Sequence, residues 1–215
     1  MLFRSTNLAK DIIHSLTGAS NIKVIYNPVN CINKINCDSK NRIVTVGRLS
    51  KEKGHRFLIE AFAKVKDLSW DLSIVGDGKE MEALKDLANK LGISDRIIFH
   101  GHQKDFSLQL SEAQIFVLPS LAEGFPNALI EAMSLPLACI SSNCIAGPNE
   151  IIQDGVNGLL VEPGNAESLT SALNKLIENQ DFRKQLALEA YKVRETLAFD
   201  KIANQYLDFI FSINE

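Results

Sequence analysis

Short apolar segments alternate with longer amphipathic ones along most of this chain. The short segments are rich in β-branched residues and are bounded by turn residues, which predicts strands at residues 42–47, 70–76, 95–101, 113–119, 136–142 and 157–163. The longer segments repeat apolar residues at helical spacing, which predicts helices at residues 54–66, 79–92, 104–112, 127–134 and 166–180, with more helix to the end. This alternation predicts an α/β fold, in which helices cover both faces of a parallel sheet.

The two ends of the chain depart from this alternation. Residues 1–28 predict a helix followed by a strand in NIKVIYNPV, which runs into a turn. Residues 199–213 predict a strongly apolar helix, whose stripe consists of Ile202, Tyr206, Phe209 and Ile210. The default expectation is that this stripe packs on the same domain, and the alternative is that it covers a second domain.

Four of the predicted strands end in loops that suit ligand binding. Open parallel sheets bind ligands beyond the carboxyl ends of their strands. The four loops contain Gly47–Arg48, Gly76–Gly78, Gly101–His102 and residues 119–127. We therefore expect these loops to share one rim of the sheet.

Composition narrows the range of partners. The chain has 215 residues, 46% of them hydrophobic, a net charge of −3 and a pI near 5.9, which suits one domain with a real core and disfavours nucleic acid. Residues 1–53 hold nine Lys or Arg against three Asp or Glu. This basic quarter fits either phosphates or an anionic membrane surface, and an ordinary solvated surface is the alternative.

Cysteine spacing and apolar runs bear on metal binding and location. The four cysteines form no Cys-x-x-Cys pair, which disfavours a zinc site. Cys139 lies in an apolar run, which predicts a small core residue. The N-terminus lacks the apolar core of a signal peptide, and no apolar run approaches the roughly 20 residues that span a bilayer. We expect a cytoplasmic protein, with peripheral contact at the inner face of the membrane as a further option.

Two loops resemble nucleotide-binding motifs without completing them. VGDGKEME lacks the third glycine of a dinucleotide fingerprint, and GRLSKEKGHR lacks the Gly-Lys-Ser/Thr of a P-loop, so a bound NAD or a P-loop NTPase is disfavoured. Arg48 and Lys53 nevertheless flank one strand-to-helix loop and can converge on a diphosphate. The alternative is two solvated surface cations.

A pair of glutamates forms the most informative motif. Glu123 and Glu131 flank Gly-Phe-Pro-Asn, and Pro126 and Asn127 mark a helix start whose N–H groups and dipole suit an anion. Gly124 lets a ligand approach the backbone closely. One carboxylate can hold a sugar and the other a ribose diol on opposite sides of a diphosphate; the alternative is two ordinary acids. The chain contains no Asp-x-Asp, so no metal cofactor is expected.

Together these motifs resemble the donor-binding C-terminal domain of retaining glycosyltransferases of family 4. They stand in family order as VIYNPV, VGRLSKEKGHRFLIEAF, LSIVGDGKEMEALKDLANKLGISDRIIFHG, AQIFVLPSLAEGFPNALIEAM and GPNEIIQDGVNGLLVEPGNAESL. The resemblance implies the C-terminal half of a GT-B fold, with a Rossmann-like parallel sheet and helices on both faces. It also implies transfer of a sugar, with retention, from UDP-hexose or UDP-N-acetylhexosamine to a glycan or lipid-linked acceptor, as in bacterial surface-polysaccharide synthesis.

The resemblance assigns roles to individual residues. Arg48 and Lys53 would bind the donor diphosphate beside Gly47, and Glu123 would contact hydroxyls of the transferred sugar; Arg48, Lys53 and Glu123 are thus the implied catalytic residues. Glu131 would bind the ribose. The remaining implied contacts are those of the base with His102 and Gln103, and those of sugar and phosphate with Gly124, Phe125, Pro126 and Asn127.

The resemblance also divides the chain. Residues 1–26 would be a remnant of the N-terminal GT-B domain, residues 27–195 the nucleotide-sugar-binding domain, and residues 196–215 the crossover helix. On this reading the stripe at 202–210 is a displaced inter-domain surface. We expect the donor-binding half of an enzyme; the alternative is a non-catalytic nucleotide-sugar-binding module or subunit that needs a separate N-terminal half. A sugar-nucleotide epimerase of the same fold is disfavoured, because it would not need the glutamate pair.

Overall fold

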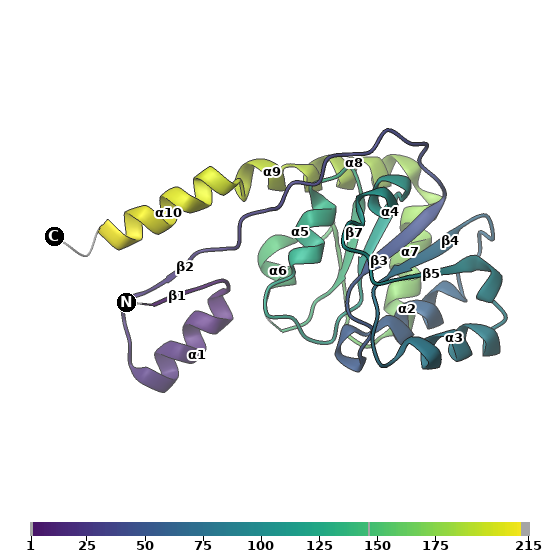
Figure 1. The fold of residues 1–215 in the computed structure, drawn as a ribbon, viewed down its shortest axis with the longest axis horizontal. Helices are drawn as coiled ribbons and strands as arrows, with labels where there is room; N and C mark the ends of the chain where they lie inside the picture. Colours follow the sequence, from purple (N-terminus) through teal and green to yellow (C-terminus); the bar gives the residue numbers. More distant parts are fainter. Residues whose placement is uncertain (1, 146, 212–215) are drawn as a thin grey trace.

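A central sheet of six parallel strands organises the molecule, as the computed structural model shows for residues 2–145 and 147–211 (Figure 1). The strand order is β5-β4-β3-β6-β7-β8. The strands are β3 (Arg42–Val46), β4 (Asp71–Val75), β5 (Ile97–Gly101), β6 (Ile115–Leu118), β7 (Ala138–Ser142) and β8 (Leu159–Val161). All six predicted strands are confirmed, each slightly shorter than the apolar run that predicted it.

Helices cover both faces of this sheet, as predicted. One face carries α2 (His55–Phe62), α3 (Met81–Lys90) and α7 (Ala166–Glu178), and the other carries α4 (Ser107–Glu112), α5 (Asn127–Met133) and the end of α8 (Gln180–Tyr191). Shorter elements and the C-terminal helix complete the chain as η1 (Lys51–Lys53), η2 (Ser94–Arg96), α6 (Pro148–Ile151), α9 (Val193–Thr196) and α10 (Phe199–Phe211).

Two separate cores form because successive strand residues point to opposite faces. Ile43 and Ile115 belong to the core beneath α2 and α7, whereas the next residues, Val44 and Phe116, belong to the core beneath α5. Cys139 is fully buried in the second core, as expected from its sequence context. Burial on both faces is why these strands are continuous apolar runs in the sequence.

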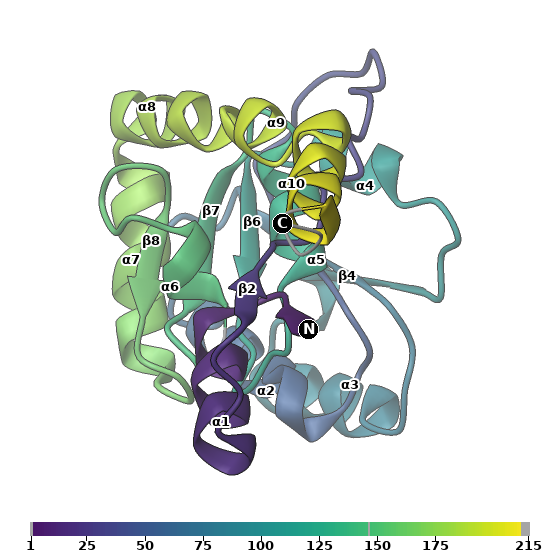
Figure 2. The same ribbon diagram turned by 90° about the vertical axis from the view of Figure 1, so that its left-hand side faces the viewer.

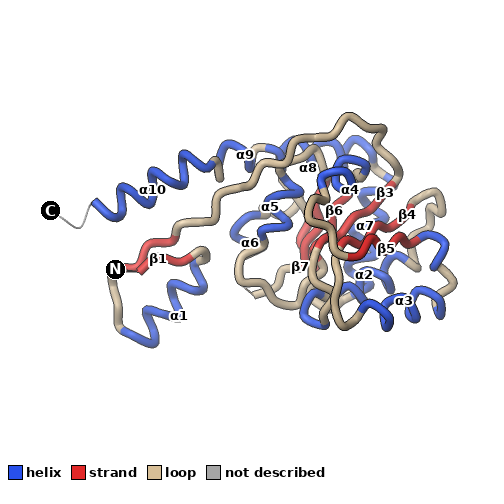
Figure 3. Tube along the Cα trace, in the orientation of Figure 1, coloured by secondary structure: helices blue, strands red, loops and turns tan. Residues whose placement is uncertain are grey.

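The strand order reverses between β3 and β6, in the middle of the sheet. After β3 the chain adds β4 and β5 on one side, and after β5 it crosses to add β6, β7 and β8 on the other (Figure 3). The switch point of the sheet therefore lies at the carboxyl edge between β3 and β6. Such a switch point is where open α/β sheets bind ligands.

A small unit precedes the sheet and lies apart from it in Figure 1, and in Figure 2 the same unit faces the viewer in front of the sheet. It consists of β1 (Leu2–Arg4), α1 (Asn7–Thr17) and β2 (Ile22–Val24), and β1 pairs with β2 in parallel. The expectation of a helix from the start of the chain is wrong at residues 2–4, where a three-residue strand is too short to show a period. α1 begins instead at Asn7, and Thr6 caps it: the Thr6 Oγ1 accepts a hydrogen bond from the Ala9 N–H.

The stripe on α10 packs largely on its own chain. Ile202 is 2% and Phe209 is 7% exposed, and Lys23 Nζ lies 5.7 Å from the centre of the Phe209 ring. The expectation that the whole stripe is a displaced surface is therefore wrong for Ile202 and Phe209, although Ile210 is exposed. Residues 212 and 213 of the predicted helix lie outside the described residues. Within residues 2–145 and 147–211, no helix combines the length and apolarity needed to cross a bilayer.

Candidate functional site

The loops after β3 and β6 are joined to each other at the switch point. The Leu121 N–H donates to the Glu52 carbonyl at 2.8 Å. Gly54 has φ +65°, and a Cβ added there would lie 2.1 Å from the Pro119 carbonyl oxygen. Only glycine allows this approach, so the two loops form one rigid rim.

Lys53 and Glu123 meet across this junction. Lys53 Nζ lies 2.7 Å from Glu123 Oε1, and the Ser120 hydroxyl donates to the same oxygen at 2.6 Å. The Glu123 side chain is only 7% exposed, whereas that of Lys53 is 28% exposed. The sequence pointed to a phosphate role for Lys53 and a sugar role for Glu123; the structure places the two charges in direct contact.

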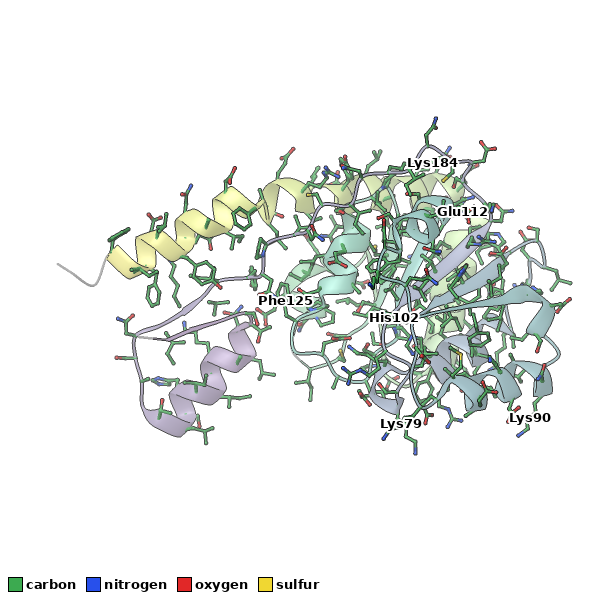
Figure 4. All side chains as sticks on the ribbon, viewed as in Figure 1. Lys79, Lys90, His102, Glu112, Phe125 and Lys184 are labelled. Atoms are coloured by element: carbon green, nitrogen blue, oxygen red, sulfur yellow. The ribbon has the colours of Figure 1, made fainter. Side chains whose placement is uncertain are left out.

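A groove of about 670 Å³ opens over the carboxyl ends of β3, β4 and β5. Its lining includes four residues that the sequence singled out, Gly47, Arg48, His102 and Gln103. It also includes Asp77, which lies in the predicted loop Gly76–Gly78, and Phe106, which sequence reasoning did not select. Three of the four predicted rim loops therefore line one groove, and His102 is labelled there in Figure 4. The fourth loop, residues 119–127, is not part of this lining, and the Lys53–Glu123 contact joins it to the loop after β3.

Glu131 lies one turn into α5, as predicted, and is half-buried. Burial raises the pKa of its carboxyl group, and no hydrogen bond to its side chain is found among the described residues. It is outside the lining of the groove. A carboxylate that loses water without gaining a protein donor is suited to accept hydrogen bonds from a ligand.

The start of α5 differs from the sequence-based expectation. Pro126 is the N-cap and is buried, and Asn127 is the first helical residue. The Asn127 N–H is not free for an anion, because it donates to the Phe125 carbonyl at 2.9 Å. Gly124 is exposed, and a Cβ there would meet nothing within 4 Å, so the fold itself does not require this glycine.

The linker after β2 holds the loop that carries this motif. The Tyr26 ring stacks on Phe125 with centroids 6.0 Å apart (Phe125 is labelled in Figure 4), and Asn27 Nδ2 donates to Asn127 Oδ1 at 3.1 Å. The Tyr26 hydroxyl donates to Glu150 Oε2 at 3.1 Å. Burial and the Glu150 carboxylate raise the pKa of Tyr26. Sequence reasoning missed Tyr26, because no local signal links it to a residue 99 positions away.

Two further titratable groups lie against the Lys53–Glu123 pair. His55 is 3% exposed beneath Gly47, and its two ring nitrogens have no hydrogen-bond partner in the described part of the chain. Burial and, to a lesser extent, Lys53 lower the pKa of His55 to about 4, so its ring is neutral near pH 7. Burial and the Glu123 charge raise the pKa of Cys144 to about 11. Among the described residues, no cluster of three or more His, Cys, Asp or Glu side chains could hold a metal ion.

The family model of glycosyl transferases group 1 matches residues 32–193. An uncharacterized glycosyltransferase of Haemophilus influenzae is 32% identical over 191 residues, which cover 87% of this chain and 54% of that protein. The lipopolysaccharide 1,6-galactosyltransferase of Salmonella typhimurium is 33% identical over 186 residues, which cover 82% of this chain and 52% of that protein. The chain thus spans about half the length of these curated relatives.

Solved structures share the fold. HepE of Anabaena, in complex with UDP and glucose, superimposes with a TM-score of 0.90 at 23% identity, over 98% of this chain and 62% of that one. The lipopolysaccharide outer core galactosyltransferase WaaB, in its apo form, superimposes with a TM-score of 0.80 at 28% identity, over 98% of this chain and 61% of that one.

Proposed function

This chain belongs to group 1 of the glycosyl transferases, and from that premise we propose that it is the donor-binding part of an enzyme that uses a UDP-sugar. The sugar is a hexose or an N-acetylhexosamine, and the acceptor is a glycan or a lipid-linked glycan. The UDP in the HepE complex and the lipopolysaccharide acceptors in the names of the galactosyltransferases support these assignments.

The observation that carries the proposal is the Lys53–Glu123 pair at the switch point of the sheet. Lys53 contacts a nearly buried carboxylate, and it follows β3 on the same loop as Arg48, which lines the groove. Arg48 and Lys53 then meet the charge of the leaving diphosphate, and Glu123 meets the sugar hydroxyls. One preorganised donor to a developing charge typically contributes about 3 kcal/mol to transition-state stabilisation.

The other site residues take the remaining parts of the donor. The groove at Gly47, His102 and Gln103 accepts the base, and the half-buried carboxylate of Glu131 accepts the ribose hydroxyls. We assign no covalent nucleophile, and Glu123 binds rather than attacks the sugar. Transfer then proceeds with retained anomeric configuration, through a transition state in which the diphosphate departs while the acceptor hydroxyl approaches.

We expect the chain to bind UDP without added metal, because Arg48 and Lys53 supply the positive charge that the diphosphate needs. Calorimetry in the presence of EDTA checks this, with GDP and ADP as comparison ligands. A ligand at 100 times its Kd also raises the free energy of unfolding by about 2.7 kcal/mol, which a thermal-shift measurement detects. If none of the three diphosphates produces heat or a thermal shift, the proposed donor site is refuted.

Substitution of the two glutamates should separate the sugar from the nucleotide. Glu131→Gln should weaken both UDP and the UDP-sugar, because both contain the ribose. Glu123→Gln should weaken the UDP-sugar and leave UDP nearly unchanged. A lost hydrogen bond to a charged group costs about 1.5–3 kcal/mol in either case, measured as the change in Kd by calorimetry. Equal losses for both ligands in both variants would contradict this division of roles.

The alternative function is a non-catalytic nucleotide-sugar-binding module that works with a separate N-terminal half. A transfer assay with radiolabelled donor separates the two functions, run on glycan and lipid-linked acceptors with and without the N-terminal half of a relative. Transfer in either arm supports the enzyme. Donor binding without transfer in both arms supports the module.

A further inference from the structure

Within the described part of the chain, the hydrogen bonds to the Glu123 carboxylate all reach one oxygen. Oε1 accepts from Ser120 Oγ at 2.6 Å and from Lys53 Nζ at 2.7 Å. Oε2 accepts no hydrogen bond from any residue that the structure describes. The described donors therefore hold the carboxylate by its Oε1 edge.

The two donors to Oε1 differ in how firmly they are held. Ser120 is 1% exposed, and its neighbours on both sides are fixed by the loop after β3: Pro119 packs on Gly54, and the Leu121 N–H bonds to Glu52. Lys53 places its charge at the end of a flexible four-carbon chain that is 28% exposed. Ser120 is the rigid donor, and Lys53 is the one that can move.

We propose that Ser120 is a positioning residue that keeps Glu123 oriented toward the donor sugar when Lys53 turns to the diphosphate. This inference rests on the proposed function, in which Lys53 binds the diphosphate and Glu123 binds the sugar. Without Ser120, the movement of Lys53 would leave Oε1 unpaired, and the carboxylate would rotate to recover a donor. A short hydrogen bond from a hydroxyl to a carboxylate is strong enough to prevent that rotation.

The test compares Ser120→Ala with Ser120→Thr, which keeps a hydroxyl. Calorimetry gives the Kd of each variant for UDP and for UDP-glucose, UDP-galactose and UDP-N-acetylglucosamine. We expect Ser120→Ala to weaken the tightest UDP-sugar about tenfold, as for a lost hydrogen bond to a charged group, and to change UDP less than about twofold. Ser120→Thr should keep most of the preference for the UDP-sugar over UDP.

A matched control is Ser111→Ala. Ser111, near the end of α4, is also buried, but its hydroxyl accepts a hydrogen bond from the Ile35 N–H. Loss of this hydroxyl should leave the ratio of the UDP-sugar and UDP affinities unchanged. A double-mutant cycle adds a readout that a purely structural role would not produce. In a Glu123→Ala background, Ser120→Ala should cause no further loss of UDP-sugar affinity, because Ser120 acts through Glu123.

The outcomes separate this inference from the proposed function. If the unsubstituted chain binds no UDP and no UDP-sugar, the proposed function fails and the role of Ser120 fails with it. If the chain binds the UDP-sugar but Ser120→Ala leaves the affinity ratio unchanged, or weakens both ligands equally, only the role of Ser120 is overturned. The same conclusion follows if the losses from Ser120→Ala and Glu123→Ala are additive.

Discussion

Replacing Gly76 by alanine is expected to destabilise the chain by about 3–5 kcal/mol and to weaken UDP binding. Gly76 follows β4 with φ +140°, and an added Cβ would lie 1.9 Å from the Gly47 carbonyl oxygen. Neither backbone can move freely, because the Gly76 N–H bonds to the Gly101 carbonyl and the Gly47 N–H bonds to the Val75 carbonyl. The methyl group would force apart the ends of β3 and β4, which form the floor of the groove.

Gly101→Ala is the matched control for this substitution. Gly101 ends the neighbouring strand β5 with φ +66°, but a Cβ there would meet nothing within 4 Å. Its replacement should cost only the strain of a left-handed backbone, about 1–2 kcal/mol. Urea denaturation of both variants measures the difference. Equal losses of stability would show that contact with Gly47 is not what requires glycine at position 76.

Acidification is expected to destabilise the chain through His55. Because burial and Lys53 lower the pKa of His55 from 6.5 to about 4, the unfolded chain binds a proton more readily than the folded chain between these values. The stability that is present above pH 6.5 is therefore lost as the pH falls toward 4. The gap between the two pKa values corresponds to a loss of about 3 kcal/mol.

The measurement is the free energy of unfolding of the wild-type chain and of His55→Met between pH 7 and pH 4. Methionine fills a similar volume without a titrating group, so the variant should lose less stability on acidification. His14→Gln is the control for the replacement of a histidine, because His14 is exposed on α1. Matching profiles for His55→Met and the wild-type chain would exclude His55 as the source of acid sensitivity.

The role of His55 was not evident from its sequence context. It follows Lys53-Gly54 at the start of a helix, a position that is often solvated. It is buried because Gly54 packs on Pro119 and draws the start of α2 under the rim. The same tertiary contact also fixes the backbone beside Ser120, which donates to Glu123 three positions further along the loop.

The apolar stripe on α10 was likewise predicted only in part. The period of Ile202, Tyr206, Phe209 and Ile210 correctly predicted a helix with an apolar face. The period does not say what covers that face. In the structure Ile202 and Phe209 are buried against the chain itself, while Phe199 and Phe211 on the same helix are exposed.

Local sequence patterns were sufficient to predict the parallel sheet, its helices and the loops at the carboxyl edge. They were sufficient because a strand buried on both faces must be apolar throughout, a buried helix face must recur every three to four residues, and close-packed strand ends require glycine. Each of these constraints acts over a few neighbouring residues, so the element it produces can be predicted from the local sequence.

Which candidate residues contact one another could be seen only in the folded chain. Lys53 and Glu123 are 70 positions apart, and they meet because the strand order places β6 beside β3. The parallel pairing of β1 with β2 and the stacking of Tyr26 on Phe125 likewise depend on packing between distant segments. Hydrogen bonds and ion pairs act over a few ångströms in space whatever the separation in sequence, so no local pattern encodes which partners they join.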